Sequence, residues 1–136
     1  MSGALNLTVR NPIAVMDLVV GFFVDTPGAE LTLEGDVSAI DWNTVSGARV
    51  REDRGFVAVP LNRSTLEVLR DSVLPRVGLR SRVSHVVVRQ GEERLFASYD
   101  NFGPGMVVVE APNREQLCAR LHAAGLLLKQ RVVLDS

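Results

Sequence analysis

The sequence has very little cysteine, and this scarcity excludes two ways of stabilising a small protein. Cys118 is the only cysteine among 136 residues, so no internal disulfide can form. One cysteine and two histidines also fall short of the ligands that a structural zinc site needs. A chain of this length can bury enough surface to fold without such a staple. We therefore expect a single domain over residues 1–136 with no metal and no organic cofactor.

Long apolar runs and targeting segments are missing as well. The longest apolar run, residues 12–24, is interrupted by Asp17 and is too short to cross a bilayer. The N-terminus lacks the basic, apolar and small-residue pattern of a secretory signal. The cysteine content gives no argument for an oxidising compartment. By default these absences predict a soluble, cytoplasmic protein without a membrane partner.

Net charge is close to zero, but its distribution along the chain is uneven. The formal charge of −1 gives no overall attraction to nucleic acid or membrane. Residues 11–48 contain no Lys or Arg, and they hold the acidic residues Asp17, Asp25, Glu30, Glu34, Asp36 and Asp41. Residues 73–90 contain no acid, and they hold Arg76, Arg80, Arg82 and Arg89. No Phe, Tyr or Trp lies among these arginines to stack bases, so we do not expect nucleic acid as the partner.

The spacing of apolar residues predicts strands joined by turns. Residues 5–9 alternate between apolar and polar side chains, which is typical of a half-buried strand. Residues 50–51 and 56–59 flank an Asp-Arg-Gly turn and form a predicted hairpin. Further strands are predicted over residues 106–110 and, as an edge strand, over residues 130–134.

The clearest predicted hairpin joins residues 84–89 to residues 94–99 through a Gly-Glu turn. The register that keeps apolar residues on one face places His85 opposite Ser98 and diagonal to Asp100. In that arrangement a carboxylate could orient the imidazole, which could activate Ser98 or a water molecule. These three residues are therefore weak candidates for a catalytic site, and the simpler interpretation is a polar sheet face beside a tight loop.

Two segments carry helical signals. Residues 64–67 match a capping box and precede an apolar stripe that ends at Pro75. A second helix is predicted over residues 114–124, with Asn113 as its cap and Gly125 as its end.

Residues 13–24 fit either a helix or a strand. Asn11 followed by Pro12 suits the start of a helix. The β-branched and aromatic residues that follow favour a strand. Because residues 25–28 have strong turn chemistry, we favour a hairpin over residues 18–34 and leave the helix as the alternative.

Together these elements predict an α+β fold. We expect an antiparallel sheet of about six to eight strands built from successive hairpins, with two or three helices packed on one face. The strand-to-helix pattern that follows Gly55 is echoed after Gly105, which predicts a pseudo-duplicated unit.

No catalytic or nucleotide-binding motif is present, so the sequence favours a binding domain over an enzyme. The expected partner is a protein or a small ligand. One version is an inhibitor- or immunity-type protein with an acidic recognition surface. The candidate binding residues are Tyr99, Asp100, Asn101 and Phe102 in one loop, the acidic Glu30, Glu34 and Asp36, and Trp42 as an exposed anchor. For Trp42 a core position is the favoured interpretation.

Three alternatives stay open. A small hydrolase would use His85 and Asp100, with or without Ser98. A homo-oligomeric structural protein, or a homodimer, would pair the acidic and arginine-rich stretches between copies. Cys118 and His122 share one face of the last helix and form half of a metal site, although Cys118 is more simply a core residue.

Overall fold

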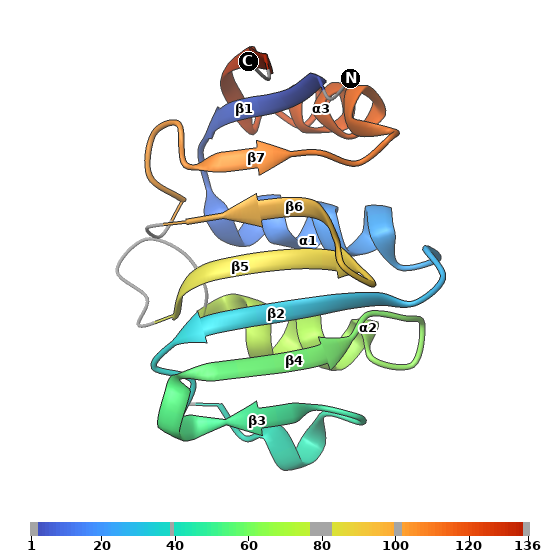
Figure 1. Ribbon diagram of the computed structural model, residues 1–136, viewed down its shortest axis with the longest axis vertical. Helices are drawn as coiled ribbons and strands as arrows, with labels where there is room; N and C mark the ends of the chain where they lie inside the picture. Colours follow the sequence, from blue (N-terminus) through green and yellow to red (C-terminus); the bar gives the residue numbers. More distant parts are fainter. Residues whose placement is uncertain (1–2, 39, 77–82, 100–101, 135–136) are drawn as a thin grey trace.

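The computed structural model describes residues 3–38, 40–76, 83–99 and 102–134, and it shows an α+β fold (Figure 1). In this part of the chain eight strands form one antiparallel sheet in the order β3-β4-β2-β5-β6-β7-β1-β8. The strands are β1 (Gly3–Val9), β2 (Ala29–Gly35), β3 (Arg49–Arg51), β4 (Phe56–Pro60), β5 (Val83–Gln90), β6 (Glu93–Ser98), β7 (Val107–Val109) and β8 (Leu127–Leu134). The predicted fold class is confirmed.

The α-helices of the described residues lie behind the sheet in Figure 1 and cover one of its faces. They are α1 (Pro12–Phe23), α2 (Leu66–Val68) and α3 (Arg114–Ala123). The helical path of α2 continues through a π turn at Leu69–Val73 and a 3-10 turn at Leu74–Arg76. The opposite sheet face, on which none of these helices packs, is called the open face below. None of the described helices is both long enough and apolar enough to cross a membrane.

The hydrophobic core lies between the sheet and the helices. Leu31, Val88 and Phe96 from the strands are fully buried against Val19 and Leu117 from the helices. Each such side chain contributes roughly 1.5–3 kcal/mol when it is removed from water. Alternate strand positions point away from this core, so they supply the side chains of the open face.

Residues 12–23 form helix α1, so the hairpin favoured over residues 18–34 is wrong in its first half. Asn11 caps the helix in a left-handed conformation with φ 56°, and its side chain accepts a hydrogen bond from the amide of Ala14. Core side chains recur at helical spacing, at Val15, Met16, Val19, Val20 and Phe23. This burial outweighs the β-propensity of the individual residues. The turn at residues 25–28 exists, but it joins a helix to β2.

A β-bulge shifts the register of the hairpin formed by β5 and β6. Val88 pairs with Phe96, whereas the next residue, Arg89, pairs with Arg94, so Leu95 is the extra residue. The Leu95 carbonyl instead accepts hydrogen bonds from the amides of Glu110 and Ala111, at 3.0 and 3.1 Å. The predicted register beyond the bulge is therefore wrong by one residue.

The caps of α2 and α3 differ from the predicted ones. The Asn62 side chain accepts hydrogen bonds from the amides of Ser64 and Thr65, at 2.9 and 3.2 Å, so Asn62 replaces the predicted capping box. Asn113 makes no side-chain hydrogen bond at the start of α3. Gly125, at φ 72°, follows the end of that helix as predicted.

The two strand-to-helix units occupy similar places in the topology. Strands β4 and β5, which α2 connects, flank β2; strands β7 and β8, which α3 connects, flank β1. The echo between the sequences after Gly55 and Gly105 coincides with these units. The pseudo-duplication itself stays a prediction.

Candidate functional site

His85 and Ser98 lie on opposite faces of the sheet. Ser98 pairs with the core residues Val86 and Val107, so its side chain points toward the helices and is fully buried. His85 pairs with Glu34 on the open face, where it is half-buried. The expected placement of His85 opposite Ser98 is therefore wrong because of the bulge. Asp100 lies outside the described residues.

Tyr99 reaches the open face, whereas Phe102 belongs to the core. The Tyr99 ring meets the His85 ring edge-on, with centroids 5.3 Å apart. Its hydroxyl accepts a hydrogen bond of 2.6 Å from Arg94, which also forms an ion pair with Glu110. Phe102 is 4% exposed. Asn101 lies outside the described residues.

Arginines from later in the chain pair with half of the acidic stretch. The Oε2 atom of Glu30 lies 2.5 Å from Nη2 of Arg49, so the two side chains form an ion pair. A second ion pair joins Asp25 to Arg63, with 2.6 Å between Oδ2 and Nη2. A third joins Asp17 to Arg70, with 2.7 Å between Oδ1 and Nε. The hydrogen bonds from Arg63 hold the pKa of the Asp25 carboxyl below its usual range. Exposed pairs of this kind add little stability, but they reduce the negative charge that the acidic stretch presents to a partner.

Long side chains cover the middle of the open face. Four small open-face side chains are between 0 and 6% exposed although no described helix packs on them: Ala58, Thr32, Val87 and Ala97. Arg49 on β3 reaches across β4 to Glu30 on β2. Arg94 and Tyr99 meet above the same face of β6. Since aliphatic stems of arginine bury apolar surface well, we attribute the burial of the central positions to these bridges.

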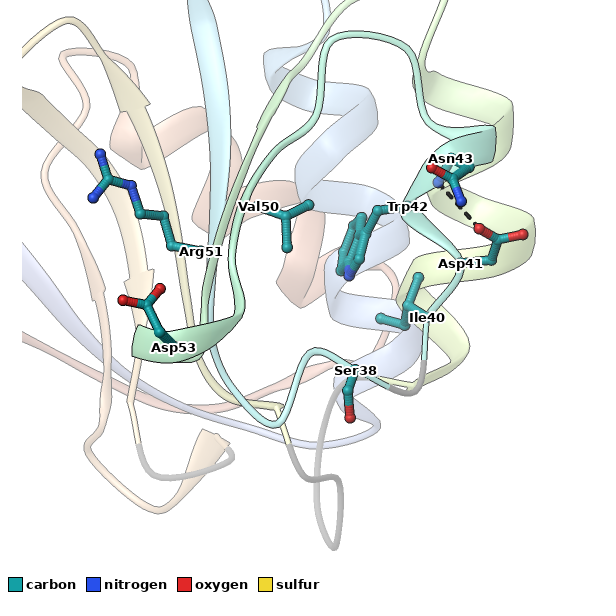
Figure 2. Close-up of a pocket in the computed structure, with 8 residues that line it drawn as sticks. All are labelled: Ser38, Ile40, Asp41, Trp42, Asn43, Val50, Arg51 and Asp53. Carbon is teal, nitrogen blue, oxygen red and sulfur yellow. Dashed lines mark hydrogen bonds between the residues drawn. The ribbon is translucent and has the colours of Figure 1, made fainter.

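Trp42 lies in a pocket beside β3, where Figure 2 shows the Val50 side chain pointing toward its indole ring. This pocket has a volume of about 820 Å³, with Trp42, Val50 and Ile40 as its apolar part and Ser38, Asp41, Asn43, Arg51 and Asp53 as its polar part. Trp42 itself is 9% exposed, and its indole N–H donates a hydrogen bond of 2.8 Å to the Val37 carbonyl. The ring is thus in a core position, with its polar atom already paired.

A second pocket, of about 680 Å³, borders the same edge strand. Figure 2 shows the Arg51 side chain pointing away from Trp42. Arg51 lines this second pocket together with Glu34, Arg49, Val50, Arg54 and Phe56. The predicted residues Glu34 and Trp42 are thus brought to neighbouring pockets beside β3, but the lining mixes charges of both signs and gives no clear ligand chemistry. Asp36 accepts hydrogen bonds from Ser38 within the adjoining loop.

The free edge of β8 is a feature that the sequence analysis did not recognise as a candidate site. Large exposed hydrophobic side chains of the described residues are Ile13, Val50, Met106, Leu128, Val132 and Val133. Half of them lie on β8, where their exposed fractions are 57% for Leu128, 56% for Val132 and 38% for Val133. The prediction of an edge strand over residues 130–134 is confirmed, and the strand is longer than expected.

Lys129 and Arg131 border a small pocket next to this edge. Its volume is about 220 Å³, and the other lining residues are Asn6, Thr8, Pro104 and Gly105. The Gly105 amide donates a hydrogen bond of 3.2 Å to the Thr8 hydroxyl, and Asn6 donates one of 2.6 Å to the Gly105 carbonyl. The Gly-Pro-Gly loop is therefore held against β1, beside the two cations of β8.

The remaining sequence candidates do not form a site. Cys118 is 3% exposed, and burial together with the charge of Glu115 raises the pKa of its thiol to about 11. His122 is exposed on the same helix. In the described part of the chain no three His, Cys, Asp or Glu side chains gather as a metal site would require. Of the arginine-rich stretch, Arg76 is exposed, Arg89 is half-buried, and Arg80 and Arg82 lie outside the described residues.

Comparisons with protein-family models, with curated proteins and with solved structures find no match to this chain.

Proposed function

We propose that this protein is a binding domain without catalytic machinery, which recruits an extended segment of a partner protein onto the free edge of β8. The observation that carries the proposal is the combination of a free strand edge with three exposed apolar side chains. An edge strand presents unpaired N–H and C=O groups along its outer side. An added strand would pair with these groups, and its side chains would pack on the exposed apolar ones.

The two edges of the sheet differ in their suitability for strand addition. Strand β3, at the other edge, has only three residues, and two of them are arginines. Very short edge strands are a common protection against unwanted pairing. Strand β8 has eight residues, so it can form several backbone pairs with an added strand. This contrast favours β8 as the docking edge.

An added strand would also enlarge the hydrophobic core. Val132 pairs with the buried Leu5, so its side chain lies on the helix-covered side of the sheet at the margin of the core. A partner side chain placed beside Val132 would remove apolar surface from water on both molecules. Each exposed valine or leucine covered in this way contributes on the order of 1 kcal/mol to binding.

Two earlier hypotheses have less support than this one. The hydrolase hypothesis used His85 with Asp100, with or without Ser98; Ser98 lies on the opposite face of the sheet from His85, and Asp100 lies outside the described residues. The inhibitor or immunity-type hypothesis relied on an acidic surface, but Asp17, Asp25 and Glu30 are paired with arginines. An inhibitory role through β8 stays compatible with strand addition, and no observation favours it specifically.

A peptide selection tests the proposed function. Peptides selected from a display library on the full chain should bind the L128S/V132S double variant about tenfold more weakly, because two apolar contacts are lost. The control variant I13S/V50S removes two exposed apolar side chains away from β8 and should bind the peptides normally. Equal affinity for both variants, or a selection that yields no β8-dependent peptide, would overturn the proposal.

A further inference from the structure

We infer that the segment recognised at β8 alternates acidic with apolar side chains, and that its carboxylates are held by Lys129 and Arg131. This inference rests on the proposed strand addition, because it concerns the chemistry of the segment that occupies that edge. It goes further by assigning a charge and a spacing to the partner, neither of which follows from a free edge alone.

The first argument is the unbalanced positive charge of β8. Lys129 and Arg131 are both exposed, and neither forms an ion pair with another described residue. Four arginines elsewhere in the fold, Arg49, Arg63, Arg70 and Arg94, each have a carboxylate partner, whereas Arg51 and Arg54 near β3 form no ion pair with another described residue. The described part of β8 contains no acid. A partner that supplies negative charge would therefore complement this edge.

The second argument is the small pocket beside the two cations, which Thr8 and Asn6 also line. Lys129 pairs with Thr8 and Arg131 pairs with Asn6 across β8 and β1, so all four side chains belong to the open face. The Thr8 hydroxyl accepts a hydrogen bond from Gly105, which leaves its own hydrogen available for donation. A carboxylate in this pocket would receive hydrogen bonds from an ammonium, a guanidinium and a hydroxyl group.

The third argument is the spacing that a strand imposes. Side chains of paired strands share a face at each paired position, and the faces alternate along the strand. Partner residues opposite Lys129 and Arg131 would thus both lie on the open face, two positions apart. The partner residue between them, opposite Gln130, would lie on the helix-covered side next to Val132. A segment in which one apolar residue separates two acidic residues would place its carboxylates beside Lys129 and Arg131 on the open face. Its apolar side chain would lie beside Val132 on the helix-covered side.

The same charges argue against a second copy of this chain as the occupant. An antiparallel pair of β8 strands centred on Gln130 would place Lys129 opposite Arg131 of the other copy. A pair centred on Arg131 would place two arginines opposite each other. Like charges that face each other across paired strands are destabilising. Pairings shifted toward either end of the strand avoid this contact; the one centred on Val132, for example, sets Arg131 against Val133.

Two peptides of the length of β8 test the inference. One alternates Glu with Val, and the other replaces each Glu by Gln. The full chain should bind the acidic peptide about three- to tenfold more tightly than the neutral one, because two exposed ion pairs form. The double variant K129Q/R131Q should lose this preference and keep its affinity for the neutral peptide. The variant R51Q/R54Q, which removes two exposed arginines near the opposite edge, should keep the preference.

The possible results separate this inference from the proposal on which it rests. If the wild type binds both peptides equally and L128S/V132S binds neither, strand addition stands and the acidic recognition is wrong. If neither peptide binds the wild type, both are wrong. A preference that survives in K129Q/R131Q overturns the inference. So does a wild-type dimer that L128S/V132S converts to a monomer in sedimentation, because a second copy then occupies the edge.

Discussion

The buried hydroxyl of Ser98 leads to a prediction about the free energy of unfolding. Its side chain is fully buried, and its Oγ has no hydrogen-bond partner. A buried polar group without a partner costs free energy. The change Ser98→Ala removes that group without leaving a large cavity, so we expect it to raise the free energy of unfolding in urea by about 1 kcal/mol.

Thr65 provides the matched comparison for Ser98, because it is also buried but its hydroxyl donates a hydrogen bond of 2.6 Å to the Pro60 carbonyl. The change Thr65→Val should lower the free energy of unfolding by about 1–2 kcal/mol. If Ser98→Ala proves as destabilising as Thr65→Val, the hydroxyl of Ser98 has a partner and our account of this position is wrong.

Cys118 is predicted to be an unreactive thiol. Burial raises its pKa to about 11, so near pH 8 only about one thiol in a thousand is ionised. Labelling by a disulfide reagent should therefore be slow in the native protein and fast in denaturant. Rapid labelling of the native protein would contradict the burial of Cys118.

The same thiol gives a prediction for alkaline pH. The unfolded chain releases the Cys118 proton near pH 9.0, whereas the native protein keeps it up to about pH 11. Because the native state binds more protons in this window, the free energy of unfolding should fall as pH rises, by up to about 1.4 kcal/mol per pH unit. The variant C118A should show a flatter dependence in alkaline urea titrations, and an unchanged slope would argue against the raised pKa.

At the scale of elements, the success of sequence-based prediction depended on whether an element is determined locally. Strand β1 was predicted because residues 5–9 alternate on a half-buried strand, and the end of α3 was predicted because Gly125 follows it. Helix α1 was misassigned because its β-branched residues favour a strand, whereas its burial depends on the distant sheet. The bulge at Leu95 could not be predicted, since it depends on the amides of Glu110 and Ala111, which follow β7.

Two turn glycines show how a neighbouring element constrains a turn. Gly55 and Gly91 have similar conformations, with φ 59° and 61°. A Cβ at Gly55 would lie 2.5 Å from the Gly35 carbonyl oxygen, whereas a Cβ at Gly91 would meet nothing within 4 Å. In urea titrations G91A should cost about 1 kcal/mol, and G55A should cost clearly more because β2 and the turn must separate. Equal costs would show that the backbone at Gly35 adjusts freely.

At the scale of the whole molecule, the candidate site depends on strand order, which no local pattern determines. The sequence predicted a strand over residues 130–134, but it could not show that this strand would be the long edge of an eight-stranded sheet, with three exposed apolar side chains, whose other edge is short. Nor could it show that distant arginines pair with Asp17, Asp25 and Glu30. Among the predicted binding residues, Glu34 and Trp42 line pockets beside β3, at the other end of the sheet.

The most direct test of strand addition at β8 is residue-resolved amide hydrogen exchange of the full chain, with and without a peptide selected for binding. Amides on the outer edge of β8 point to solvent in the free protein, and alternate residues should become protected when an added strand accepts their hydrogen bonds. Our account predicts new protection at every second residue of β8 and none at β3. Protection confined to β3 or to the helices, with β8 exchanging as before, would contradict it.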